Sequence, residues 1–199
     1  MLEETININI LALGNSQVGK TTYLIRNTKN VFEIHLATIG YNILSKEIKL
    51  KDGKKVNIKF CDTSGQERYH SLAPNFIKKA DGIILMYDIT DRESFDTISK
   101  WWEDILNNKE KDFPVILVGN KIDLEDNREV KREEGENLAK KLNTKFFEIS
   151  NKDGTNVKES SRELISMVLN YNTDDLMTTC SKLTKKNLKK RKCFISKIC

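Results

Sequence analysis

The sequence predicts an α/β fold in which a mostly parallel sheet is covered by helices on both faces. Short apolar runs at residues 82–89 and 114–120, GIILMYDI and PVILVGN, alternate along the chain with helical patterns. Continuous apolar runs of strand length are typical of strands buried on both faces of a parallel sheet. Strands that alternate with helices indicate the α/β class. The 199 residues are enough for one domain with a substantial core and few for two.

The first half of the chain contains the edge of this sheet. Residues 6–13 alternate and then run apolar, which predicts a central strand, and a helix is expected at about 20–27 after a glycine-containing loop. Residues 41–50 and 54–62 resemble a β-hairpin, because the Asp52-Gly53 pair between them suits a tight primed turn. The hairpin should therefore add one antiparallel edge strand to the sheet.

The second half supplies the remaining strands and helices. A last strand is expected at 145–150, so that the sheet has six strands. Helical patterns are found at about 92–108, after a cap at Thr90 or Asp91, and at 131–142 and 155–170. Periodicity fades at about residue 172, so we expect a folded domain at 1–171 and a flexible tail at 172–199.

Charge is divided unevenly between these two parts. The net charge is +5, but no acidic residue follows Asp175 and eight basic residues do, so residues 176–199 carry +8 and residues 1–175 carry −3. The basic character therefore belongs to the tail, and we expect no nucleic-acid partner for the domain. No run of 18 apolar residues is present, and the acidic start MLEE argues against an export signal. Four scattered cysteines do not form a disulfide framework, and Cys61 is expected to be a small buried apolar residue.

The segment GNSQVGKT at residues 14–21 fits the pattern of a phosphate-binding loop. A loop that leaves a strand and opens a helix directs its backbone N–H groups at one point, and glycines let a phosphate come close. Lys20 would contact the β and γ phosphates. The residues expected to contact the phosphates are Ser16, Gln17, Val18, Gly19, Lys20, Thr21 and Thr22.

A magnesium site is expected beside this loop. Thr21 offers a hydroxyl to Mg²⁺, and Asp62 offers a carboxylate at the end of the strand KVNIKFCD. The carboxyl ends of neighbouring parallel strands lie on one edge of the sheet, where such folds bind their ligands.

The segment GNKIDL at residues 119–124 predicts that the base is guanine. The Asp123 carboxylate can accept hydrogen bonds from the guanine N1–H and exocyclic amine, whereas adenine presents an acceptor at N1 and no amine at that edge. Such a site can discriminate by about 10⁴ or more. Asn120 would fix the loop and reach the base, and the Lys121 stem would cover its face.

With these motifs in place, residues 5–171 resemble the Ras superfamily of small GTPases and, within it, the Rab family. The segments GNSQVGKT, TIG at 38–40, DTSGQE at 62–67, GNKID at 119–123 and EISNK at 148–152 occur in the family's order. DTSGQERYHSLAP and LMYDITDRESF are similar to Rab proteins in particular, and RYHSLAP is similar to the early-endosomal branch. The resemblance implies a P-loop small G domain that binds GTP and GDP with Mg²⁺ and hydrolyses GTP.

The resemblance also implies roles for single residues. Thr38 should bind Mg²⁺ and sense the γ phosphate, Gly65 should donate its N–H to that phosphate, and Gln66 should orient the attacking water. Phe32 is a candidate to pack against the guanine, and Ser150, Asn151 and Lys152 should line the base. Several positions depart from the family: Rab proteins usually carry Trp at Cys61 and Ala at Asn151, Tyr41-Asn42 breaks the usual run after TIG, and the segment between Phe32 and Thr38 is one residue short.

Hydrolysis is expected to be slow, because no arginine is placed in the chain as a finger, and a GTPase-activating protein is then needed for speed. The two histidines, His35 and His70, are expected to be exposed loop residues. Residues of about 33–41 and 64–78 should be ordered by GTP and read by an exchange factor, a GTPase-activating protein and effectors. The chain is expected to be monomeric.

The tail ends in KKNLKKRKCFISKIC, where basic residues surround cysteines. A polybasic segment with a prenyl group is a two-signal membrane anchor, so Cys199 and Cys193 are candidate lipidation sites. A solvated basic tail or a nuclear targeting segment is the alternative. The expected protein is cytoplasmic and cycles onto the cytosolic face of an endomembrane in vesicular traffic. The rival readings are a GTP-binding adaptor without turnover and an ATP-using P-loop kinase, which NKID disfavours.

Overall fold

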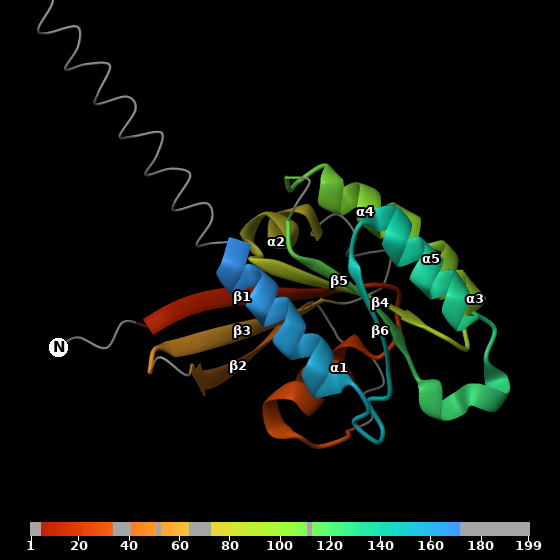
Figure 1. Cartoon of the computed structure of the whole chain (residues 1–199), viewed down its shortest axis with the longest axis horizontal. Helices are drawn as coiled ribbons and strands as arrows, with labels where there is room; N and C mark the ends of the chain where they lie inside the picture. The colour runs from red at the N-terminus through yellow and green to blue at the C-terminus, as the bar shows by residue number, and fades with distance from the viewer. Residues whose placement is uncertain (1–4, 34–40, 51–52, 64–72, 111–112, 172–199) are drawn as a thin grey trace, which may run out of the picture.

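β1 (Thr5–Leu13) lies inside the sheet because its side chains become continuously buried from Ile10 to Leu13. The computed structural model of the chain describes residues 5–33, 41–50, 53–63, 73–110 and 113–171. Within them, the strands form one six-stranded sheet in the order β2-β3-β1-β4-β5-β6. Figure 1 shows this sheet between two layers of helices. The predicted α/β class and the number of strands are confirmed.

All neighbouring strands are parallel except one pair at the edge. β2 (Tyr41–Lys49) runs antiparallel to β3 (Lys55–Thr63), whereas β1 pairs in parallel with β3 and with β4 (Gly82–Asp88). β5 (Val115–Asn120) and β6 (Lys145–Ile149) continue the parallel part. Every side chain of β4 and β5 is buried, as continuous apolar runs predict for strands covered on both faces.

The hairpin between β2 and β3 closes differently from the expected primed turn. The Gly53 N–H donates to the Leu50 carbonyl at 3.0 Å, and the Leu50 N–H donates to the Lys54 carbonyl at 2.9 Å. Gly53 therefore ends the turn, with a φ of 90°, instead of occupying its centre together with Asp52. The glycine is used for its left-handed backbone conformation, but one position later than the sequence predicted.

Two apolar cores separate the sheet from its helices. One core contains α1 (Lys20–Lys29) and the helix at residues 157–171, whose contacts include Tyr23, Leu24, Leu164 and Val168. The other contains α2 (Ala73–Lys79), α4 (Ile98–Leu106) and α5 (Arg132–Leu142). In Figure 1 the blue helix at 157–171 lies on the opposite side of the sheet from α2, α4 and α5.

The helix expected at 92–108 is in fact two helices. α3 (Arg92–Asp96) ends at Thr97, and α4 begins at Ile98. The Thr97 side chain is turned toward the phosphate loop, because its hydroxyl donates to Asn15 Oδ1 at 2.8 Å. The cap is Asp91, not Thr90, because its side chain accepts a hydrogen bond from the Ser94 N–H at 3.2 Å.

The parallel arrangement brings the carboxyl ends of five strands to one edge of the sheet. Its register sets Ala12 opposite Asp62, Asp88 opposite Asn120, and Asn120 opposite Ile149. The 3-10 helix η2 (Ile122–Asn127) follows β5 at this edge. Each predicted motif that the structure describes therefore lies where ligands of α/β sheets bind. Among the described residues, no helix combines the length and apolarity that crossing a bilayer requires.

Candidate functional site

The loop between β1 and α1 is shaped by glycines that allow close backbone contacts. Gly14 and Gly19 have φ values of 141° and 99°, in the region that favours glycine. A Cβ atom at Gly14 would overlap the Met86 carbonyl oxygen in β4, and one at Gly19 would overlap the side-chain amide of Asn120. The loop therefore lies directly against the ends of β4 and β5, as a phosphate-binding loop at the sheet edge requires.

Lys20 is folded into this loop. Its side chain is buried, with 5% of the residue exposed, and Nζ donates to the carbonyls of Gly14 at 2.9 Å and Asn15 at 2.6 Å. Burial lowers the pKa of Lys20 to about 8, and the negative charge of Asp62 opposes this shift. Of the three N–H bonds of the ammonium group, these carbonyls take two, so one remains for a ligand in the described part of the site.

Thr21 and Asp62 form the oxygen pair expected for magnesium. The Thr21 hydroxyl donates to Asp62 Oδ2 at 2.6 Å, and Asp62 has 0% of its surface exposed. A hydroxyl and a carboxylate are hard oxygen ligands of the kind that Mg²⁺ takes alongside water and phosphate oxygens. The donor set therefore fits this ion. Within the described residues, no group of three or more His, Cys, Asp or Glu side chains offers a metal site instead.

The other residues predicted to contact the phosphates lie in different surroundings. Val18 is fully buried, and its carbonyl accepts a hydrogen bond from Asn120 Nδ2 at 2.8 Å. Ser16 is half-buried, and the exposed Gln17 has a φ of 63°. The Thr22 hydroxyl in α1 lies 3.4 Å from the Glu33 carbonyl. These residues thus contribute backbone at the site more than side chains.

Asn120 joins the predicted phosphate loop to the two segments that the sequence predicts to bind the base. Besides its bond to Val18, its Oδ1 accepts from the Asn151 N–H at 3.3 Å. The Asn151 side chain adds a second link, since its Nδ2 donates to the Gly19 carbonyl at 3.0 Å. Asn120 and Asn151 are almost completely buried. Three segments distant in sequence are thus held together by side-chain amides.

The carboxylate of Asp123 lies at the outer side of this junction. The Ser150 hydroxyl donates to Asp123 Oδ1 at 2.8 Å, and Lys152 Nζ lies 3.9 Å from Oδ2. The Asp123 side chain is 16% exposed, so it is oriented by neighbours while it stays accessible. Lys121 points its ammonium group at Asp88, with Nζ 2.5 Å from Oδ2. The arrangement can accept two N–H donors from a planar ligand.

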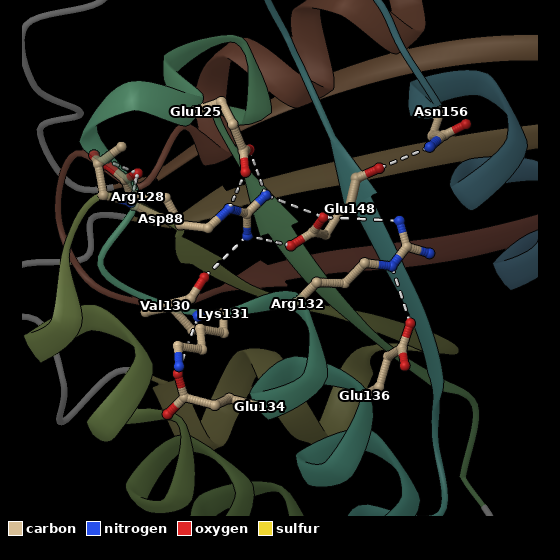
Figure 2. Close-up of polar contacts among 11 residues, drawn as sticks. Asp88, Glu125, Arg128, Val130, Lys131, Arg132, Glu134, Glu136, Glu148 and Asn156 are labelled. Atoms are coloured by element: carbon tan, nitrogen blue, oxygen red, sulfur yellow. Dashed lines mark hydrogen bonds and ion pairs between the residues drawn. The ribbon is translucent and has the colours of Figure 1, made fainter.

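Arg128 also connects the segment of Asp123 to the segment of Ser150. No sequence pattern singles out this residue. Figure 2 shows its guanidinium between Glu125 of η2 and Glu148 of β6. Arg128 donates to Glu148 at 2.6 and 3.2 Å and to Glu125 at 2.8 and 2.7 Å. The hydrogen bonds to Glu125, followed by those to Glu148, hold the pKa of Arg128 above its ordinary value.

This ion pair positions the base-binding segments because of where its partners lie. Glu125 is two residues after Asp123, and Glu148 is two residues before Ser150. Glu148 is nearly buried, with 5% of its side chain exposed, and its carbonyl accepts from Asn156 Nδ2 at 2.8 Å. Arg128 is thus a buried link between the end of β5 and the end of β6.

Some predicted residues lie away from this cluster or outside the described residues. Phe32 is 41% exposed, so its side chain is available to a ligand or partner. Cys61 is half-buried instead of fully buried, and burial raises the pKa of its thiol. The predicted residues that lie outside the described residues are His35, Thr38, Gly65, Gln66, His70, Cys193 and Cys199.

Comparison with known proteins shows which family the chain resembles. A family model described as Ras family matches residues 9–170 of the chain. Ras-related protein Rab-3C of Bos taurus is 38% identical over 170 residues, which cover 85% of this chain and 74% of the relative. Ras-related protein Rab-15 of Rattus norvegicus is 40% identical over 175 residues, which cover 86% and 82%. Ras-related protein Rab-3A of Homo sapiens is 39% identical over 170 residues, which cover 85% and 77%.

Proposed function

The chain belongs to the Ras family and to its Rab branch, and from this premise we propose that it is a guanine-nucleotide switch of vesicular traffic. It binds GTP and GDP with Mg²⁺, hydrolyses GTP slowly, and associates with a membrane in a nucleotide-dependent cycle. The junction of three segments at the sheet edge supports this most strongly. Lys20 belongs to the phosphate-loop motif, and Asn120 and Asp123 belong to GNKIDL, 100 residues further along the chain. The Asn120 amide nevertheless contacts the Val18 carbonyl at 2.8 Å and the Asn151 N–H at 3.3 Å, and so joins the three segments.

Guanine recognition belongs to Asp123. Its carboxylate, oriented by Ser150, accepts from N1–H and from the exocyclic amine of guanine. Adenine would leave this carboxylate facing an acceptor, and an unpaired buried polar group costs about 1–3 kcal/mol, with charged groups costing more. Asn120, Lys121, Asn151 and Lys152 complete the base site by holding the two loops and covering the base.

The phosphates and the metal belong to the β1–α1 loop and to Asp62. Thr21 and Asp62 would hold Mg²⁺, together with Thr38 as the family resemblance implies. When bound, the ion would neutralise negative charge on the phosphates. Lys20 directs its remaining N–H at the phosphates, and its buried ammonium is worth more there than in water because the local dielectric constant is low.

Hydrolysis requires a water placed in line with the γ phosphate, and the family resemblance gives this role to Gln66. Gly65 and Thr38 hold the γ phosphate in the same scheme. No arginine finger is proposed within the chain, so the intrinsic rate should be of the order found for Ras, about 10⁻⁴–10⁻³ s⁻¹. A GTPase-activating protein would supply the missing charge.

The proposed switch implies protein partners and a membrane surface. Residues of about 33–41 and 64–78 would be ordered by the γ phosphate and read by exchange factor, activating protein and effectors. The basic tail with Cys193 and Cys199 would anchor a monomeric protein to the cytosolic face of an endomembrane, with an endosomal membrane as the first candidate. Mass spectrometry of the protein isolated from cells tests the anchor, and an unmodified C-terminus contradicts it.

Single-turnover hydrolysis tests the switch against the rival adaptor without turnover. The wild-type chain, loaded with GTP and Mg²⁺, should convert it to GDP at the slow rate given above. Gln66→Leu should bind GTP equally well and hydrolyse it at least about tenfold more slowly, because the water loses its orienting group. A wild-type chain that retains GTP indefinitely is an adaptor. Equal turnover by the two proteins removes Gln66 from the mechanism.

A further inference from the structure

Asn15 lies within the phosphate loop, but its side chain belongs to a different set of contacts. Its Oδ1 accepts hydrogen bonds from the Thr97 hydroxyl at 2.8 Å and from Trp101 Nε1 at 3.1 Å. Thr97 is the residue between α3 and α4, and Trp101 follows one turn later in α4. One side-chain oxygen therefore fastens the phosphate loop to the junction of two helices.

The backbone of Asn15 contacts the phosphate-binding lysine instead of the helix junction. Its carbonyl oxygen accepts from Lys20 Nζ at 2.6 Å, next to the Gly14 carbonyl at 2.9 Å. These two carbonyls set the direction of the remaining N–H of the ammonium group. Any movement of the Asn15 backbone would therefore turn Lys20 with respect to the phosphates.

The helix junction is a firm anchor for this contact. Trp101 is only 5% exposed and packs in the core with α2, α4 and α5. The Thr97 backbone N–H donates to the Glu93 carbonyl at 3.1 Å, which fixes the residue that carries the donating hydroxyl. Thr97 and Trp101 are both held by their helices, so the Asn15 side-chain oxygen that accepts from both of them is held in place as well.

We propose that Asn15 is a positioning residue for the phosphate grip of the chain. Through Thr97 and Trp101, the α3–α4 junction holds the Asn15 backbone, and the Asn15 carbonyl holds the Lys20 ammonium in its productive direction. This inference rests on the nucleotide-binding function proposed above. It adds that the grip on the phosphates depends on a helix junction which itself carries no nucleotide-binding residue.

The test is the release of fluorescent N-methylanthraniloyl-GDP from the full-length chain with Mg²⁺. Asn15→Ala removes both hydrogen bonds to the helix junction and should speed nucleotide release about tenfold. Trp101→Phe removes only one of them and should speed release by less than that. Trp102→Phe is the matched control, since it changes the neighbouring, partly buried tryptophan of the same helix. It should release the nucleotide at the wild-type rate.

Two further measurements separate positioning from a general loss of stability. In the double variant Asn15→Ala/Trp101→Phe, release should be no faster than in Asn15→Ala alone, because both changes act on one contact. The phosphorus NMR signal of the β phosphate in bound GDP should move in Asn15→Ala but stay in place in Trp102→Phe. Asn15→Asp, which retains an acceptor oxygen, should restore the signal position.

Three results would overturn the proposal. They are wild-type release from Asn15→Ala, fully additive effects of Asn15→Ala and Trp101→Phe, and an unmoved β-phosphate signal despite faster release. In each of these cases the wild-type chain still binds GDP, and the proposed function stands. A wild-type chain that binds no guanine nucleotide would instead overturn the proposed function and this inference with it.

Discussion

Asp123 illustrates how single residues of this site are prepared for a ligand. The Ser150 hydroxyl and the more distant Lys152 ammonium fix its carboxylate from two sides, and 16% of the side chain stays exposed. A carboxylate held this way loses little orientational freedom when it accepts two N–H groups, so more of the interaction energy is available for selectivity.

Replacing Asp123 by Asn should weaken GDP binding by about two to four orders of magnitude, because the new amide sets a donor against a guanine donor. Xanthosine diphosphate, which carries a carbonyl in place of the exocyclic amine, should bind this variant better than it binds the wild-type chain. Competition against fluorescent GDP measures both. Asp126→Asn, an exposed change in the same 3-10 helix, is the control. Unchanged GDP affinity in Asp123→Asn would refute the base assignment.

Lys20 gives nucleotide binding a proton dependence. Its pKa of about 8 in the nucleotide-free fold should rise when phosphates arrive, because their charge favours the ammonium form. Binding of GDP at pH 8 should therefore take up about half a proton. Calorimetry in buffers with different ionisation enthalpies measures the uptake. Binding without proton uptake would show that Lys20 does not meet the phosphates.

The same group affects the stability of the nucleotide-free protein with a definite sign. The folded-state pKa of about 8 is below the ordinary value of 10.5, so the unfolded chain binds the proton more tightly between these values. The Lys20 contribution to the free energy of unfolding therefore rises with pH across this window and is smallest below pH 8.

At the scale of elements, Arg128 holds the ends of β5 and β6 together. Arg128→Met should lower the free energy of unfolding by about 3–5 kcal/mol, because the buried Glu148 carboxylate loses its hydrogen-bonded partner and keeps only the more distant Arg132 at 3.8 Å. GDP should also leave faster, since Asp123 and Ser150 lose their common support. Chemical denaturation and GDP release measure the two effects.

Arg132→Ala is the matched control, because Arg132 is 64% exposed and its nearest approach to Glu148 is 3.8 Å. It should change stability by less than about 1 kcal/mol. The double variant Arg128→Met/Glu148→Leu should recover much of the stability, since no buried charge then remains unpaired. If Arg128→Met alone is as stable as the wild-type chain, the ion pair does not support the site.

The elements show what local sequence can and cannot predict. The strands were predictable because β4 and β5 are continuous apolar runs, and a run of that kind needs no information from elsewhere in the chain. The break at Thr97 is not predictable from local sequence, because the apolar spacing continues across it and the Thr97 hydroxyl is bonded to Asn15, 82 residues earlier in the chain. α2, with seven residues, is too short for a periodic pattern to reveal.

The site shows the same division. Lys20, Asp62, Asn120 and Asp123 stand in motifs whose spacing is local, and the structure brings them to one edge. Arg128 lies in a charged segment and Glu148 in the largely apolar strand β6, 20 residues apart, and Asn15 and Trp101 lie 86 apart. No local pattern marks these pairs, because strand order and helix packing decide them.

At the scale of the whole molecule, we expect the folded domain to bind the nucleotide and the basic tail to bind the membrane. The described residues carry the sheet, both cores and the loops predicted to bind base and phosphates, whereas residues 176–199 contain eight basic residues and no acidic one. Because the chain belongs to the Ras family, we expect the two parts to work as one switch whose state is set by the bound nucleotide. That expectation depends on three distant loops meeting around one guanine nucleotide.

Titration calorimetry of the nucleotide-free, full-length chain with GDP and with ADP, both with Mg²⁺, tests this most directly. The account predicts one GDP per chain and an affinity for ADP that is lower by about 10⁴ or more, because Asp123 faces an acceptor on adenine. Equal affinity for the two nucleotides, or no binding of either, would contradict it.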